Sequence, residues 1–137
     1  MRGELVWATL RIVYGLFFFA TGVFIVASIT TRMLPALVQP TASAQEFTDA
    51  LSASGFIEPL LAAAYGAGGG VLLFDRSAPL GIVTLAGPVA VILFFHLTLS
   101  GQYIWGPAVA ATLAALAWHY RLRLETLWSA SPVAKQL

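Results

Sequence analysis

The chain contains no cysteine. Cysteine thiolates ligate structural zinc and iron–sulfur clusters, and they are the reacting groups of thiol redox proteins. Disulfide relays, thiol redox catalysis, thiolate zinc sites and iron–sulfur ligation by this chain are therefore excluded.

Charged residues are also scarce. They make up 9% of the 137 residues, whereas a soluble domain has about 25%. Hydrophobic residues make up 59%, and the mean hydropathy is +0.86. The apolar residues form continuous runs instead of alternating with a period of two, which favours transmembrane helices over a barrel. The net charge of +1 comes without a basic block, so nucleic acid is not an expected partner.

Four apolar stretches are long enough to be membrane spans. The first continues to Ile29, beyond the length of a signal-peptide core. We predict one all-α membrane domain over residues 1–137, an antiparallel bundle of four transmembrane helices in the lipid bilayer. The predicted spans are residues 5–29, 57–74, 78–98 and 104–120.

The only long connection joins the first two spans and covers residues 30–56. It exceeds the length usual for a loop without structure. Ser43 stands three residues before Glu46, which is the spacing of a helix capping box, and Gly55 is placed to end the helix. The pattern predicts a short amphipathic helix in this first outer loop.

The basic residues predict the orientation. With both termini in the cytoplasm, five of them lie on the inner side and only Arg32 lies outside, which satisfies the positive-inside rule. The inner five are Arg2, Arg76, Arg121, Arg123 and Lys135. Residues 121–137 are then a cytoplasmic tail.

Glycines recur at helical spacing in the first two spans. Gly15 and Gly22 share one face of the first span, and Gly66 and Gly70 share one face of the second. Small residues at this spacing let two helix backbones approach closely in a membrane. We expect these four glycines to form helix-packing surfaces.

Charged residues near the inner surface form a candidate inner cluster. Arg11 lies within the first span, Glu4 lies on the same face, and Asp75 and Arg76 lie in the turn before the third span. A charge at this depth is costly unless it is paired. Arg11 either pairs or extends to the interface and so determines the helix register, or it contacts an anion or ligand.

A second candidate is an outer pocket formed by Glu58, Tyr65, His96, Tyr103 and Trp105. These residues lie in the outer halves or at the outer ends of spans two, three and four. A histidine and a tyrosine among aromatic side chains suit a quinone headgroup, which needs donors to its carbonyl oxygens. The same residues also suit ordinary packing and water-facing loops.

The two histidines do not suggest a haem or a metal. His96 lies near the outer end of the third span and His119 near the inner end of the fourth. An antiparallel arrangement separates them by ~20 Å or more, so they cannot be the two axial ligands of one haem. Neither has a second ligand at helical spacing, so no metal site is predicted.

Three groups of residues resemble the DoxX and DoxX-like family of small prokaryotic membrane proteins. They are Arg11 to Gly15 followed by Gly22, Pro59 with Gly69-Gly70 and Arg76-xx-Pro79, and Pro88 with His96-Leu97. The resemblance implies a four-helix bundle in the prokaryotic cytoplasmic membrane. It also implies association with quinone-linked sulfur oxidation or with membrane redox-stress complexes. Relatives commonly carry a glutamate where this chain has Tyr65, which argues against a proton-handling role based on that acid unless Glu58, one to two turns further outward, takes its place.

Three functions remain open at this point. The first is a non-catalytic subunit of a membrane complex, with a protein partner or a second copy, because the sequence has no catalytic constellation. The second is a quinone-reactive subunit of a thiosulfate- or sulfur-oxidising complex, with quinone as a possible cofactor. The third is a small transporter or lipid-handling protein, which the Gly87-Pro88 break in the third span suggests.

Overall fold

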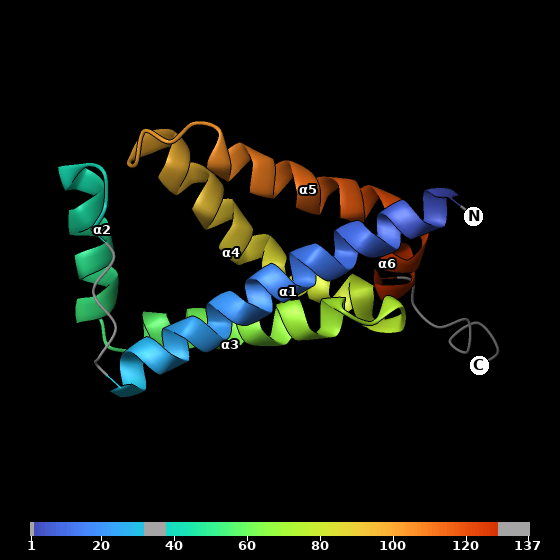
Figure 1. Cartoon of the computed structure of the whole chain (residues 1–137), viewed down its shortest axis with the longest axis horizontal. Helices are drawn as coiled ribbons and strands as arrows, with labels where there is room; N and C mark the ends of the chain where they lie inside the picture. The colour runs from blue at the N-terminus through green and yellow to red at the C-terminus, as the bar shows by residue number, and fades with distance from the viewer. Residues whose placement is uncertain (1, 32–37, 129–137) are drawn as a thin grey trace, which may run out of the picture.

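The computed structural model describes residues 2–31 and 38–128, and within these residues every regular element is a helix (Figure 1). The elements are α1 (Arg2–Thr31), α2 (Ala42–Ala53), α3 (Ile57–Leu72), the 3₁₀ turn η1 (Asp75–Ser77), α4 (Ala78–Thr98), α5 (Trp105–His119) and α6 (Arg121–Trp128). Arg32, Lys135 and the end of the predicted tail lie outside the described residues.

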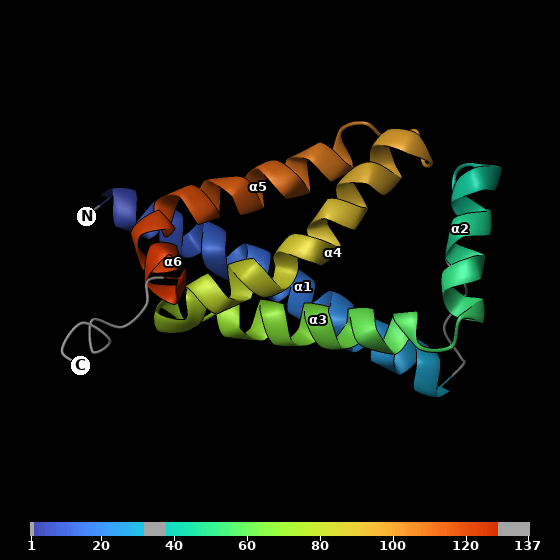
Figure 2. The ribbon, with the colours of Figure 1, turned by 180° about the vertical axis from the view of Figure 1, so that it is seen from behind.

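The four long helices pack in chain order. α1 packs along α3, α3 against α4, and α4 against α5, with a smaller contact that closes the set between α1 and α5. The start of α1, η1 and α6 lie at one end of the molecule, while α2 stands across the other end (Figure 1). From behind, α4 runs diagonally between the η1 end of α3 and the start of α5 (Figure 2).

The helix bounds follow the apolar runs. α4 begins and ends where the sequence predicts, with Pro79 in its first turn, and it continues through Pro88 as one helix of 21 residues. α1 extends the predicted span to 30 residues. α3 and α5 are shorter than predicted, with 16 and 15 residues.

Two stretches are long and apolar enough to cross a membrane by themselves, α1 and the unit of η1 with α4. α2 and α3 together form a third candidate that is bent by 93°. The described residues are therefore those of a helical protein that can associate with a membrane.

Glycines bring α1 and α3 into backbone contact. A Cβ atom at Gly22 would lie 2.6 Å from the backbone nitrogen of Gly66, and one at Gly15 would lie 3.0 Å from the carbonyl oxygen of Gly69. A Cβ at Gly69 would lie 2.6 Å from the carbonyl oxygen of Gly15 and would collide with the backbone nitrogen of Phe19. The helices can pack at this distance because no side chain stands between them.

Two predicted packing glycines lie beside α1, but their own Cβ positions do not point at its backbone. A Cβ at Gly66 would meet no atom within 4 Å, and one at Gly70 would meet only the Phe19 ring, at 3.5 Å. The α3 residue whose own Cβ position faces the α1 backbone is Gly69. Residues four apart are offset by about 40° around a helix of 3.6 residues per turn. Positions in a strict four-residue pattern therefore turn progressively away from the face that contacts α1.

The other helix pairs use glycine in the same way. A Cβ at Gly81 of α4 would lie 2.8 Å from the carbonyl oxygen of Gly68 in α3. A Cβ at Gly106 of α5 would lie 2.7 Å from the Cβ of His96 in α4. Consecutive helix pairs are thus each joined at a glycine.

The centre of the bundle is aromatic and aliphatic. Phe18 is 1% exposed, and its ring lies 4.9 Å from that of Tyr14 and 5.3 Å from that of Tyr65. Leu72 of α3 and Leu85 of α4 are fully buried beside this group. Close packing of these side chains determines the mutual rotation of the helices.

α2 begins two residues earlier than the capping-box pattern predicts. Its N-cap is Thr41, whose hydroxyl accepts a hydrogen bond from the Ala44 N–H at 3.2 Å. The same hydroxyl donates to the carbonyl oxygen of Leu99 at the end of α4, at 2.5 Å. Ser43 is therefore not the cap, because only Thr41 also reaches α4. Gly55 does follow the helix end with φ +73°, a conformation that favours glycine.

Candidate functional site

Arg11 is buried, and it binds the end of a neighbouring helix. Its side chain is 6% exposed, and its guanidinium donates to the carbonyl oxygens of Leu72 and Leu73 at 2.8 Å and 2.5 Å. These carbonyls lie at the C-terminus of α3, where the helix leaves acceptors unpaired and carries partial negative charge. α1 and α3 are antiparallel, which places Arg11 beside this end, so its charge stabilises α3.

The Nε atom of Arg11 is buried and has no hydrogen-bond partner within the described residues. The guanidinium thus caps α3 through a single nitrogen, Nη1. Of the two alternatives for Arg11, the contacts correspond to the structural one, in which the side chain determines how α1 and α3 align.

Asp75 of the inner cluster has partners besides Arg11, although the charge of Arg11 also acts on it. Asp75 accepts from the Tyr120 hydroxyl at 2.5 Å and forms an ion pair with Arg123 at 2.5 Å. These two hydrogen bonds hold the pKa of the Asp75 carboxyl below its ordinary value, because they stabilise the charged form. Glu4 and Arg76 are exposed.

Tyr120 and Arg123 were missing from the sequence-based cluster. Tyr120 is the last residue of the predicted fourth span and Arg123 follows it, and their spacing of three residues is that of neighbours on one helix face. This spacing is the signal that could have found them. It was not distinctive, because any basic residue after a span also satisfies the positive-inside rule.

An aromatic pair joins α1 and α5 at the same end of the molecule. The rings of Trp7 and His119 stack with centroids 4.6 Å apart and planes 13° apart. Further along, the Tyr14 hydroxyl donates to the carbonyl oxygen of Val109 at 2.9 Å. These contacts hold together two helices about a hundred residues apart in the chain.

The five residues of the predicted outer pocket do not share one set of neighbours. Tyr65 packs in the core against Phe18. Glu58, at the start of α3, accepts a hydrogen bond from the Ser52 hydroxyl of α2. The Nδ1 atom of His96 lies 2.8 Å from the carbonyl oxygen of Ile92, one turn earlier in the same helix.

The remaining two residues of that set are exposed. Tyr103 is 65% exposed in the loop before α5, and Trp105 is 50% exposed. The Trp105 ring meets the Phe17 ring of α1 edge to face at 5.9 Å. Tyr65 of α3 faces α1, His96 lies where α4 meets Gly106 of α5, and Trp105 of α5 faces α1. The three side chains therefore lie in three different helix interfaces and do not line one pocket.

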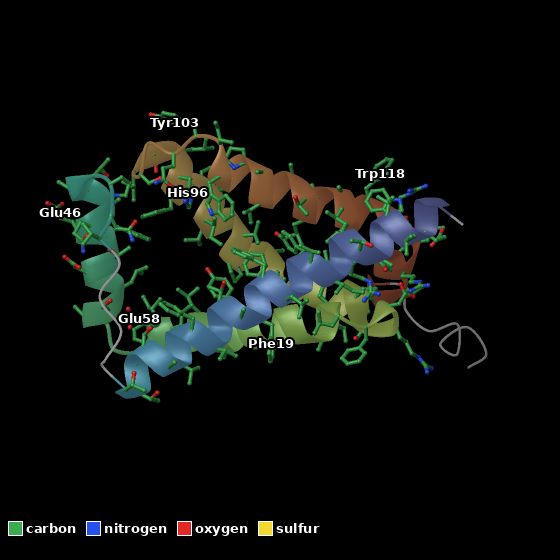
Figure 3. All side chains as sticks on the ribbon, viewed as in Figure 1. Phe19, Glu46, Glu58, His96, Tyr103 and Trp118 are labelled. Atoms are coloured by element: carbon green, nitrogen blue, oxygen red, sulfur yellow. The ribbon has the colours of Figure 1, made fainter. Side chains whose placement is uncertain are left out.

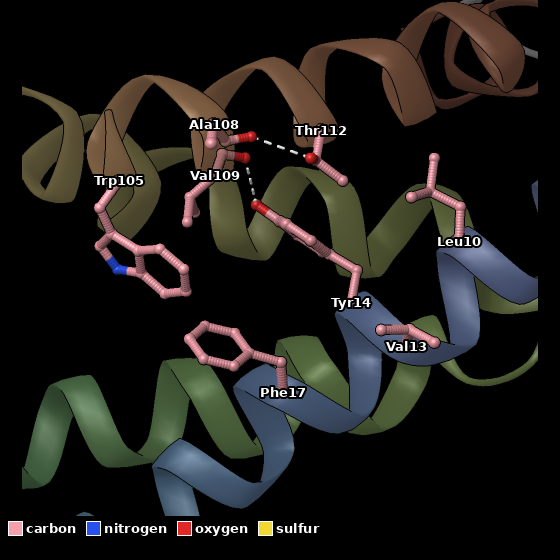
Figure 4. Close-up of a pocket in the computed structure, with 8 residues that line it drawn as sticks. All are labelled: Leu10, Val13, Tyr14, Phe17, Trp105, Ala108, Val109 and Thr112. Carbon is pink, nitrogen blue, oxygen red and sulfur yellow. Dashed lines mark hydrogen bonds between the residues drawn. The ribbon is translucent and has the colours of Figure 1, made fainter. Parts of the chain in front are cut away.

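Trp105 instead lines a groove between α1 and α5 (Figure 4). The groove has a volume of ≈ 280 Å³. Its walls are Leu10, Val13, Tyr14 and Phe17 of α1 and Trp105, Ala108, Val109 and Thr112 of α5. The Tyr14 hydroxyl donates a hydrogen bond to the Val109 carbonyl, and the Thr112 hydroxyl donates one to the Ala108 carbonyl at 2.9 Å. The groove is thus an apolar slot.

These features define the class of the protein as an all-helical protein with apolar, membrane-compatible helices. No group of three His, Asp or Glu residues suited to a metal occurs in the described part of the chain. Neither a family model nor a curated protein nor a solved structure matches the chain.

Proposed function

We propose that the chain is a four-span membrane protein in which α1, α3, α4 and α5 all cross the bilayer. The distribution of charged residues and of interfacial aromatic residues supports this proposal. Glu46, Glu58 and Tyr103 lie at one end of the bundle and Trp118 lies at the other (Figure 3). Between Ile12 and Thr31 of α1, and over the whole of α4 and α5, there is no Asp, Glu, Lys or Arg.

The two short helices are compatible with spanning. α3 has 16 residues and α5 has 15, so at 1.5 Å per residue they measure about 24 Å and 22 Å. The hydrocarbon core is about 30 Å thick. Local thinning of the bilayer and burial against longer neighbours accommodate such a mismatch.

The charge asymmetry supports a cytoplasmic location for the η1 end. That end holds Arg11, Arg76, Arg121 and Arg123, whereas residues 38–58 and 99–104 at the opposite end contain no Lys or Arg. Both termini are then cytoplasmic. In this orientation α2 is an amphipathic helix on the outer surface, held to α4 by the Phe47–Phe95 ring contact at 5.6 Å.

Labelling of single cysteines tests the topology. The chain has no cysteine of its own, so Arg76→Cys, Gln102→Cys and Glu125→Cys each carry one thiol. With four spans, we expect a membrane-impermeant maleimide to label intact cells only at position 102. Positions 76 and 125 should react after the membrane is permeabilised.

The three labels separate the possible topologies. If only α1 and α4 cross, position 76 reacts from outside and position 102 is protected. If α1, the bent α2–α3 pair and α4 cross, positions 102 and 125 both react from outside. Either pattern would refute the four-span proposal.

For its role, the chain is best described as a non-catalytic, DoxX-like subunit or partner in a membrane complex. The observation that carries this role is the use of Arg11, the buried cation, as the cap of α3. The Tyr14 hydroxyl and the His96 ring likewise contact backbone carbonyls within the chain. The link to a redox complex comes from the family resemblance. Quinone binding at the five-residue pocket is not proposed, because those side chains point into separate interfaces.

Purification in a mild detergent tests this role. A tagged chain expressed in its native host is expected to co-purify with a stoichiometric membrane protein or as a homo-oligomer. The partner should remain with Arg76→Gln, which alters an exposed side chain in the turn. A protein that is a strict monomer in detergent and also after cross-linking in native membranes would refute the role.

A further inference from the structure

The groove between α1 and α5 is bounded by two aromatic pairs. Phe17 and Trp105 meet edge to face at one end of it (Figure 4). Trp7 and His119 stack beyond the other end. Between these pairs, the Tyr14–Val109 hydrogen bond joins the two helices. The result is a slot with two helical walls and defined ends.

The chemistry of the walls selects an apolar occupant. The Tyr14 and Thr112 hydroxyls are bonded to carbonyls of α5, and every other lining side chain is aliphatic or aromatic. From Leu10 to Phe17, the α1 wall of the groove rises about 10 Å, which is about two thirds of one leaflet of a hydrocarbon core of about 30 Å. This length accommodates the terminal part of a lipid acyl chain.

Positive charge lies beyond the Trp7–His119 end. Arg123 is neutralised by its ion pair with Asp75. Arg121 is exposed, its guanidinium lies 4.8 Å over the Trp118 ring, and it donates to the Trp118 carbonyl. Within residues 2–31 and 38–128, Arg121 forms no ion pair with a carboxylate. Its charge is therefore available at the level of the lipid headgroups.

We infer that this groove binds one acyl chain of an anionic phospholipid from the cytoplasmic leaflet. The chain lies between α1 and α5, and the phosphate lies near Arg121, with the Trp7 and His119 rings at the boundary. This inference rests on the proposed membrane topology. An anionic headgroup complements Arg121, and anionic lipids are attracted to basic residues on this side of the membrane.

Photo-cross-linking in vesicles tests the inference. The protein is reconstituted in phosphatidylcholine with a small fraction of a probe lipid that carries a diazirine near the end of one chain. The probe is either phosphatidylglycerol or phosphatidylcholine. We expect phosphatidylglycerol to label Val13, Phe17 and Ala108 roughly fivefold more than phosphatidylcholine does, equivalent to about 1 kcal/mol for one basic residue near the surface.

Two matched variants locate the charge. Arg121→Gln should abolish the preference for phosphatidylglycerol, while Arg76→Gln, which removes the same charge from the turn before α4, should keep it. Equal labelling of the groove by both probes would overturn the lipid site and leave the membrane proposal standing. So would labelling of other apolar faces with none in the groove, the result expected if a second copy fills it. No labelling of any helix would overturn membrane insertion itself.

Discussion

Replacing Arg11 with leucine is expected to lower the free energy of unfolding by about 2–4 kcal/mol. The guanidinium donates to two carbonyls at the end of α3, and a hydrogen bond to a charged group contributes about 1.5–3 kcal/mol. Removal of a buried charge returns part of that loss, because the guanidinium no longer has to be desolvated. The lost bonds outweigh this gain, since leucine leaves one buried and one partly buried carbonyl without this donor.

Reversible unfolding in mixed detergent micelles, followed by circular dichroism, measures this difference. Arg11→Lys should lie between wild type and Arg11→Leu, because an ammonium keeps the charge but lacks the planar arrangement of donors. Arg76→Leu is the matched control, since Arg76 is exposed, and it should change stability by no more than about 0.5 kcal/mol. Equal stability of Arg11→Leu and wild type would show that Arg11 does not stabilise α3.

Replacing Gly69 with alanine is expected to destabilise the α1–α3 pair by about 1–3 kcal/mol. The new Cβ would collide with the backbone of Phe19 and lie 2.6 Å from the Gly15 carbonyl oxygen. A backbone cannot move aside as a side chain can, so the helices must separate along their contact. The higher helix propensity of alanine, about 1 kcal/mol, offsets only part of this penalty.

The neighbouring glycine provides the control. A Cβ at Gly70 would lie 3.5 Å from the Phe19 ring, an ordinary contact, and one at Gly66 would meet nothing within 4 Å. Gly70→Ala and Gly66→Ala should therefore leave stability unchanged or raise it by up to about 1 kcal/mol. The same micelle titration compares the three variants. If Gly69→Ala is as stable as Gly70→Ala, the close approach of α1 and α3 is incorrect.

The helix bounds were the part of the fold that local sequence could predict best. The apolar run from Ala78 to Thr98 has Pro79 at its start, and α4 covers the same residues. Similarly, α3 begins at Ile57 as predicted, and Gly55 adopts the positive φ that ends α2. These features depend on the length of apolar runs and on glycine and proline, which act over a few residues.

The N-cap of α2 shows where local patterns stop. Ser43 and Glu46 have the spacing of a capping box, yet Thr41 caps the helix. The hydroxyl of Thr41 also bonds Leu99, 58 residues away. Ser43 and Thr41 are both acceptable caps by local sequence, and the hydrogen bond to the end of α4 favours Thr41. A local pattern cannot predict such a contact with another helix.

The sequence alone determined that this protein is helical and apolar and that most of its charges lie outside the apolar runs, because these properties follow from composition and run length. Tertiary structure decided which glycine meets a backbone, which carbonyls Arg11 caps, and that Trp105 joins a groove instead of the predicted pocket. Such contacts depend on how each helix rotates against its neighbours. Successive residues lie about 100° apart around a helix, so the rotation of the whole helix decides which of them faces a neighbour. Packing between segments distant in the chain sets that rotation, as between Tyr14 and Val109.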